Sequence, residues 1–298
     1  MRAPRLLFVI LLAAVSSPAR GAGPKVHRFA GGEASRLSSS YWFLTERGSV
    51  MVDAPFLASE AGSLKAAMSS AAALPLGAAI LTGGRPESSW GLVPLLSPAT
   101  RVWGARSTLA TLDGAFARER ERLLRAGVAF VEMPRTPPRV TNPFTGSLNL
   151  GFEGYTLRLQ EGGEPGGPPS TVVFVPETGE LFAGALVWNR VHPVTGGADL
   201  GAWRRRLAEL RRLGPRLVYP GYGEPGTAEL LDRMSDYLGA LEEAVRPLAF
   251  RPSLSPRDVA NVRQALTRRN RDWALPGELD SSIRSEHARL RGLLAGRE

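Results

Sequence analysis

The sequence predicts a layered α/β fold with two β-sheets. Short apolar segments typical of strands occur in two blocks, and helical patterns follow each block. The chain has 298 residues, of which 43% are hydrophobic, and this is enough to form a large core. The sequence shows no solenoid repeat. We therefore expect one large domain in which the two sheets and the helices form successive layers.

The first block combines four strands with three helices. Strands are expected at 41–44, 49–53, 78–81 and 101–103. Helices are expected at 58–73, 90–96 and 109–126. Gly48 provides the tight turn of a hairpin between the first two strands, and Pro75 and Pro98 end the first two helices. Residues 134–146 are rich in Pro, Thr and Asn and are expected to form a loop.

The second block also combines strands with helices, and it continues to the end of the chain. Strands are expected at 155–159, 171–175, 181–185 and 217–219. Helices are expected at 199–213, 225–245, 255–270 and 278–295. A turn-rich loop with several Gly and Pro residues occupies 161–170. The last two helices are expected to form a C-terminal helical extension over residues 251–298.

Residues 1–21 have the pattern of a secretory signal peptide. Arg2 and Arg5 precede ten apolar residues, and small residues follow at 16–22. Ten residues of helix rise only about 15 Å, which is half of a bilayer core, so a permanent span is disfavoured. We expect cleavage after Ala19 or Gly21 and a periplasmic or secreted bacterial protein with no stable membrane span.

Composition excludes several kinds of site. The chain has no Cys, which excludes disulfides, Cys-ligated zinc, iron–sulfur clusters and a Cys nucleophile. Its three histidines, His27, His192 and His287, lie far apart and match no metal-ligand spacing. They are too few for a site with four or five His ligands. We expect them to be surface or capping residues, with His27 in a leading strand.

The net charge of +9 comes almost entirely from arginine, because Lys25 and Lys65 are the only lysines. The densest arginine runs, at 204–212 and 268–271, fall in predicted helices. Their expected role is to form solvent-exposed helix faces, and we expect no nucleic-acid partner. Salt-sensitive binding of an acidic protein partner to these helices is a further hypothesis.

Four fragments, in the expected order, resemble the metallo-β-lactamase superfamily and in particular its exported bacterial zinc metallohydrolase-like members. They are the strand at 49–53 with Ala54-Pro55, the strand end at 80–82 followed by Gly91, the hairpin formed by 174–177 and 182–185, and Pro220-Gly221-Tyr222-Gly223. The resemblance covers residues 25–250. It implies an αββα sandwich, two mixed sheets between helical layers, as a domain over 22–250. The C-terminal extension is similar to the terminal helices of that subgroup.

The same resemblance implies that the metal ligands of the family are missing here. The positions of the His-x-His-x-Asp-His motif fall on Gly83, Arg85, Glu87 and Ser88. The bridging Asp falls on Ala185, the last His on Tyr222 and the mid-chain His near Gly166. Asp53, which supports the metal ligands in the family, is the one residue of the set that is present.

These replacements disfavour zinc and zinc-dependent hydrolysis. Gly and Ala supply no side-chain donor, Arg repels the cation, and Ser and Tyr are poor zinc ligands at neutral pH. Without zinc there is no bound hydroxide to act as nucleophile. We therefore expect no cofactor and no catalytic residue. A carboxylate pair of Asp53 and Glu87 is less favoured than an arrangement in which Glu87 pairs with Arg85 and Asp53 accepts backbone N–H bonds.

Other chemistries have weaker support. Gly83-Gly84 follows a strand but lacks the rest of a phosphate-binding motif, and Ser88 and Ser89 lack a partner base. Five tryptophans are expected to pack in the core or the cleft; they are Trp42, Trp90, Trp103, Trp188 and Trp203.

The resulting pocket is expected to contain Asp53, Gly83, Arg85, Glu87, Ser88, Ala185 and Tyr222. Arg85 and Tyr222 are expected to face each other there. Arg85 then either binds a small anion or simply neutralises the carboxylates and fills the space. The resemblance also makes His192 the histidine nearest to this edge. The favoured function is an inactive protein that binds a ligand or a protein partner. The alternatives are a hydrolase with residual or unusual activity and an Arg-rich interaction module.

Overall fold

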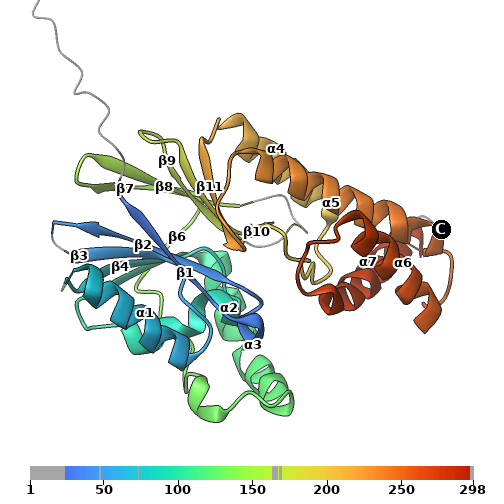
Figure 1. Ribbon diagram of the computed structural model, residues 1–298, viewed down its shortest axis with the longest axis horizontal. Helices are drawn as coiled ribbons and strands as arrows, with labels where there is room; N and C mark the ends of the chain where they lie inside the picture. Colours follow the sequence, from blue (N-terminus) through green and yellow to red (C-terminus); the bar gives the residue numbers. More distant parts are fainter. Residues whose placement is uncertain (1–23, 47, 73, 163–166, 168–169, 296–298) are drawn as a thin grey trace, which may run out of the picture.

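The computed structural model describes residues 24–46, 48–72, 74–162, 167 and 170–295. Two β-sheets pack face to face, and helices cover the outer face of each (Figure 1). This is the αββα sandwich that the sequence predicts. The proposed signal peptide, residues 1–21, and Gly166 lie outside the described residues, so their predicted roles stay predictions.

The first sheet has six strands in sequential order. They are β1 (Val26–Ala30), β2 (Ser39–Thr45), β3 (Gly48–Val52), β4 (Leu76–Leu81), β5 (Arg101–Ala105) and β6 (Asn142–Phe144). The pairs from β1 to β3 are antiparallel, and those from β3 to β6 are parallel. Its outer face is covered by α1 (Ala58–Ala71), α2 (Pro86–Ser89), the 3-10 helix η2 (Trp90–Leu95) and α3 (Arg106–Arg125).

The second sheet has the strand order β11-β10-β9-β8-β7. These strands are β7 (Ser147–Phe152), β8 (Tyr155–Glu161), β9 (Thr171–Val175), β10 (Glu180–Trp188) and β11 (Leu217–Tyr222). The pair β10–β11 is parallel, and the others are antiparallel. Its outer face packs against α4 (Leu200–Arg212) and α5 (Glu229–Val245). The last two helices, α6 (Pro256–Arg269) and α7 (Leu279–Ala295), pack against α5. Short 3-10 helices lie at η1 (Glu33–Ser35), η3 (Phe130–Glu132), η4 (Arg246–Leu248) and η5 (Pro276–Glu278).

Alternating residues of the strands build the core between the sheets. Val50 and Val52 of β3 face Val173 and Val175 of β9 in one apolar cluster. Met51 lies between Val50 and Val52, and because side chains alternate along a strand it points to the helices outside. The two-sided burial of most of β3 and β4 explains why their central residues, 50–52 and 78–81, are all apolar.

All the strands and helices expected from the sequence are present, with ends shifted by a few residues. The prediction of a continuous loop over 134–146 is wrong, because β6 lies within it, and β7 was not predicted. Pro143 in β6 and the Asn and Gly residues of β7 are unfavourable in strands, but both strands lie at sheet edges, where such residues are tolerated. Pro86 begins the short helix α2, which the sequence analysis also missed.

The arginine runs lie on solvent-facing helix surfaces, as predicted. The exposed members on α4 are Arg204, Arg205, Arg211 and Arg212, and Arg268 and Arg269 are exposed on α6. Within the described part of the chain, no helix combines the length and the apolar character that a membrane span requires.

Candidate functional site

The carboxyl ends of β3 and β4 place Asp53 beside Thr82. The strands are parallel, so the residues that follow them emerge at the same edge of the sheet. The Asp53 carboxylate accepts hydrogen bonds from the backbone N–H of Thr82 at 2.8 Å and from its hydroxyl at 2.6 Å. The expected backbone bond to Asp53 is confirmed. Asp53 has a φ of 58°, a left-handed conformation that directs its side chain back onto the next strand.

Two glycines allow β10 and β11 to approach this edge. Gly184 has a φ of 50°, and a Cβ atom there would lie 2.3 Å from the Thr82 hydroxyl oxygen. A Cβ at Gly221 would lie 2.6 Å from the carbonyl group of Gly184. These close approaches bring Ala185 and Tyr222 to the edge at which Asp53 and Thr82 lie.

Arg85 and Tyr222 lie close together at this edge. The Arg85 guanidinium donates to the Val194 carbonyl oxygen at 2.9 Å, and its Cζ is 5.9 Å from the ring centroid of Trp188. Trp188 stacks on Tyr222 with centroids 3.4 Å apart. Burial raises the pKa of Tyr222, and the charges of Arg85 and Arg36 oppose that rise. The buried Tyr222 hydroxyl makes no hydrogen bond within the described residues.

Glu87 is held by Arg36, so the predicted Glu87–Arg85 pair is wrong. Arg36 follows η1 in a left-handed conformation and forms an ion pair with the buried carboxylate of Glu87. Arg36 also pairs with Glu278 at 3.0 Å. Arg85 and Glu87 are two residues apart at the start of α2, and side chains at that spacing do not face each other on a helix.

The other predicted pocket residues contribute backbone or local bonds. The Ser88 hydroxyl donates to the Arg85 carbonyl oxygen, and the Ala185 carbonyl oxygen accepts from the Trp188 indole N–H. Gly83 is buried, yet a Cβ built on it would meet no atom within 4 Å. Neither Ser88 nor Ala185 therefore offers an acidic or imidazole group to a ligand.

A cavity of about 500 Å³ opens beside Arg85 and Glu87. Its apolar wall consists of Trp90, Leu112 and Phe116, and the charged residues around it are Arg36, Arg85, Glu87, Glu119, Arg122 and Glu278. Arg122 forms a bidentate ion pair with Glu119, and Arg36 is paired with Glu87 and Glu278. Within the described residues Arg85 forms no ion pair, so it is the cation of this wall that remains available for an anion.

Four of these charged residues were not predicted. Arg36, Glu119, Arg122 and Glu278 come from the segment before β2, from α3 and from η5. No motif marks them in the sequence. Their role depends on tertiary contacts between segments that are far apart along the chain.

A surface position, expected as one of two alternatives, is wrong for two of the three histidines, although His287 lies against the last carbonyl of η4, as a capping residue does. His192 and His287 are buried. The Nδ1 atom of His192 lies 2.7 Å from the Tyr237 hydroxyl, and burial lowers the pKa of His192 to about 4. The Nε2 atom of His287 lies within hydrogen-bond distance of two backbone carbonyl oxygens. His27 is half-buried on β1 and stacks on Trp42. All five tryptophans named above are buried, as expected.

Comparison with solved structures identifies the fold. A metallo-β-lactamase from Pontibacter korlensis superposes with a TM-score of 0.58 at 19% identity, covering 74% of this chain and 97% of that one. The chain has the metallo-β-lactamase fold. DIM-1 metallo-β-lactamase gives a TM-score of 0.51 at 19% identity over 72% of this chain and 92% of its own. A double mutant of the sec-alkyl sulfatase PisA1 gives 0.66 at 14% identity over 93% of this chain.

The present chain spans 51% of the length of that sulfatase. At these identities the similarity shows the fold alone. No protein-family model matches the sequence, and no curated protein sequence matches it either.

The residues at this edge do not fit the zinc site associated with the fold. Among the described residues, no group of three or more His, Cys, Asp or Glu side chains is placed to hold a metal ion. The Glu87 carboxylate is bound by Arg36, and both oxygens of Asp53 accept hydrogen bonds from Thr82. Arg85 adds a fixed positive charge that opposes a divalent cation.

Proposed function

We propose that this chain is an exported protein of metallo-β-lactamase fold that works without a metal and binds a small organic anion next to Arg85. The observation that carries the proposal is the Arg85 guanidinium on the cavity wall. Arg85 has no carboxylate partner in the described part of the chain, whereas Arg36 and Arg122 are both paired. A guanidinium binds a carboxylate or phosphate through two parallel hydrogen bonds.

The rest of the cavity supports an organic ligand. Trp90 and Phe116 provide aromatic surface beside Arg85, and a volume of about 500 Å³ is in the range of small-molecule sites. Tyr222 lies near Arg85, but its hydroxyl is buried and does not line this cavity. Export rests on the signal-peptide pattern of residues 1–21.

Binding is favoured over hydrolysis because the site lacks an activated nucleophile. Ser88 is bonded to the backbone, and Glu87 is neutralised by Arg36. A hydrolase with residual activity would require another group to activate water, and an Arg-rich interaction module would act through α4 and α6 instead.

Metal analysis tests the metal-free part of the proposal. Protein purified from zinc-supplemented cells is expected to contain substoichiometric zinc, measured by mass spectrometry of the metals. Treatment with a chelator should leave the melting temperature unchanged, because no metal stabilises the fold. One zinc per chain, lost together with stability on chelation, would contradict the proposal.

Anion binding tests the role of Arg85. Benzoate and inorganic phosphate are suitable probes, one with an apolar body and one without. Arg85→Gln is expected to weaken the tighter probe about tenfold or more in calorimetric titration, because charged hydrogen bonds are lost. Arg257→Gln, an exposed site on α6, is the matched control and should bind like the parent protein. Equal binding by all three proteins, or saturable binding by none, would refute the assignment.

A further inference from the structure

A second cavity lies at the opposite edge of the sandwich. It has a volume of about 630 Å³ and is bordered by Gly48, Gly77 and Arg101, which lie at the amino-terminal ends of β3, β4 and β5. Asp53 and Thr82 follow the carboxyl ends of β3 and β4, so this cavity is separate from the candidate site.

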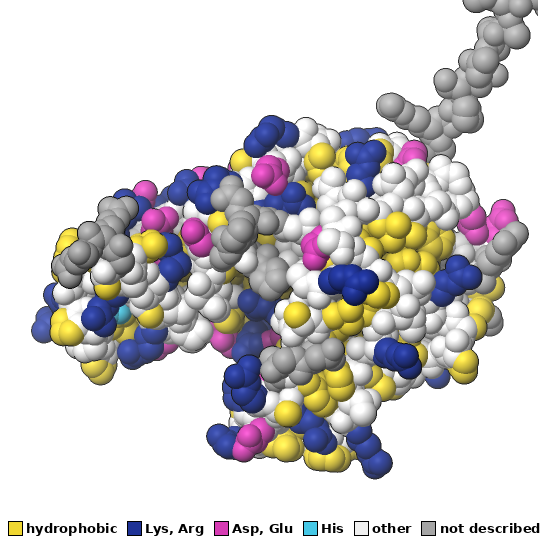
Figure 2. Space-filling view, turned by 180° about the vertical axis from the view of Figure 1, so that it is seen from behind, with side chains coloured by type: hydrophobic (Ala, Val, Ile, Leu, Met, Phe, Trp, Pro, Cys, Tyr) yellow, Lys and Arg dark blue, Asp and Glu magenta, His cyan; other side chains and the backbone are white. Residues whose placement is uncertain are grey.

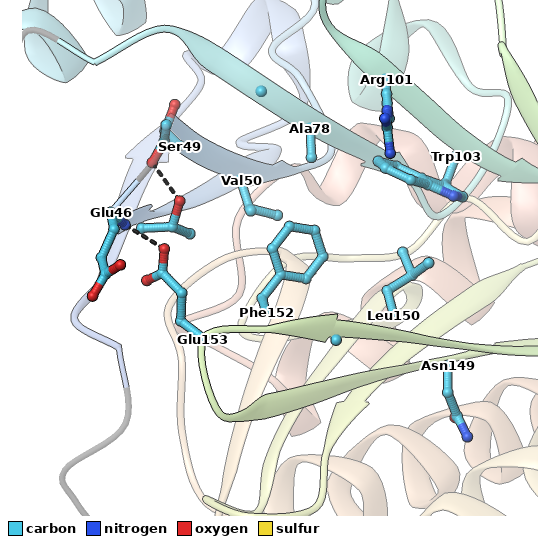
Figure 3. A pocket seen from close by; sticks show the side chains of 14 residues that line it. Glu46, Ser49, Val50, Ala78, Arg101, Trp103, Asn149, Leu150, Phe152 and Glu153 are labelled. Carbon is cyan, nitrogen blue, oxygen red and sulfur yellow. Dashed lines mark hydrogen bonds between the residues drawn. The ribbon is translucent and has the colours of Figure 1, made fainter.

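The walls of this cavity are apolar side chains from both sheets. Val50, Ala78 and Trp103 face it from the first sheet, and Leu150 and Phe152 of β7 face it from the second. Figure 3 shows Val50 and Phe152 pointing toward each other across the space. Leu150 and Phe152 are only half-buried because β7 is the last strand of its sheet. The inter-sheet core is therefore open to solvent at this end.

Arg101 occupies an inward-facing position at the mouth of this cavity. In the strand register Val50 is opposite Ala78, and Ala78 is opposite Arg101, so the three side chains lie on one face of the sheet. Trp103, two residues further along β5, lies on that same face and belongs to the inter-sheet core. No ion pair of Arg101 occurs among the described residues, and its side chain is exposed.

Among the described residues, the charged side chains at the other end of the cavity are acidic. Glu153 follows β7, and its carboxylate accepts a hydrogen bond from the backbone N–H of Glu46. Figure 3 shows Glu46 and Glu153 on the side of the cavity away from Arg101. A ligand with one negative group is therefore oriented, because that group is attracted to Arg101 and repelled by the glutamates.

We infer that this cavity binds an amphiphilic monoanion, with an aliphatic or aromatic body between the two sheets and a terminal carboxylate on Arg101. The volume and the mixture of apolar walls with a cation, Arg101, that forms no ion pair within the described residues are typical of small-molecule sites. The apolar body covers the half-buried faces of Leu150 and Phe152, and the carboxylate supplies the counter-charge that Arg101 lacks.

Calorimetric titration with octanoate and with 1-octanol tests this inference. The parent protein is expected to bind octanoate saturably and 1-octanol more weakly. Arg101→Gln should weaken octanoate binding about tenfold or more and leave 1-octanol binding unchanged, because the variant removes one charge from an exposed position. Ala78→Leu places extra side-chain volume in the cavity and should weaken both probes.

Two control variants locate the binding. Arg257→Gln should behave as the parent protein. Octanoate also carries a carboxylate and an apolar body, so it can bind at Arg85 as well, and Arg101→Gln is therefore also compared in the Arg85→Gln background, where only the second cavity remains. Circular dichroism melting checks that each variant is folded. Absence of saturable octanoate binding to Arg85→Gln, or octanoate binding that Arg101→Gln leaves unchanged in that background, would overturn the inference. The Arg85 result with benzoate and phosphate is a separate measurement, so failure of one assignment leaves the other to be judged on its own data.

Discussion

Replacing Arg36 with methionine is expected to lower the free energy of unfolding by about 3–5 kcal/mol, because the Glu87 carboxylate is left buried without its cation. The Glu87 side chain is 4% exposed, and Arg36 forms its ion pair from a segment 51 positions earlier in the chain. Methionine preserves most of the side-chain volume. It is also an L residue at the same left-handed backbone position, so the substitution isolates the loss of charge.

Urea unfolding of a double-mutant cycle measures this coupling. Glu87→Gln should restore most of the stability that Arg36→Met removes, because a neutral amide costs less to bury than an unpaired carboxylate. The Glu278→Gln variant is the control for the second, more exposed pair of Arg36 and should change stability by about 1 kcal/mol or less. An Arg36→Met variant as stable as the parent protein would show that Glu87 finds another counter-charge.

The basic side chain that neutralises Glu87 lies far away in the sequence, and for this reason the ion pair was not predicted. The segment between β1 and β2 has two consecutive left-handed residues, Arg36 and Leu37, and neither of them is a glycine. Asp53 was predictable, because a polar residue after a buried parallel strand has the neighbouring strand end within reach. The partner of Glu87 was not predictable, because only the packing of the whole chain brings Arg36 next to Glu87.

The burial of His192 also depends on tertiary packing that the sequence does not reveal. His192 was expected at the surface or at a helix cap, because the three histidines match no metal-ligand spacing. The structure instead encloses it between Tyr237 of α5 and Trp273, with ring centroids 5.7 and 5.6 Å away. Short apolar runs predicted most strands and the layered fold correctly. They carry no information about which helix returns to cover a particular polar residue.

On the face shown in Figure 2, the Lys and Arg side chains are spread over the surface. The family resemblance singled out Arg85, whereas Arg101 looks the same in the sequence as the arginines of α4. The position of Arg101 at the start of a parallel strand, beside apolar walls, is recognised only in the three-dimensional structure.

Asp53→Asn is expected to become more stable relative to the parent protein as the pH rises from 4 to 7. Burial raises the pKa of Asp53 to about 7, although hydrogen bonds from Thr82 oppose the shift. A carboxyl group whose pKa is raised on folding favours the folded state below its unfolded pKa, and this contribution is lost as the pH rises through the folded value. A shift of about three pKa units corresponds to about 4 kcal/mol between these limits.

The measured quantity is the difference in unfolding free energy between variant and parent at each pH. This difference is needed because His192 acts in the opposite direction. Burial lowers the pKa of His192 to about 4, so its contribution grows as the pH rises toward the unfolded value. His192 is present in both proteins and cancels. Asp236→Asn, at an exposed position on α5, should follow the parent protein at every pH. If the Asp53→Asn curve also runs parallel to the parent, Asp53 is ionised throughout this range and its hydrogen bonds from Thr82 outweigh the cost of burial.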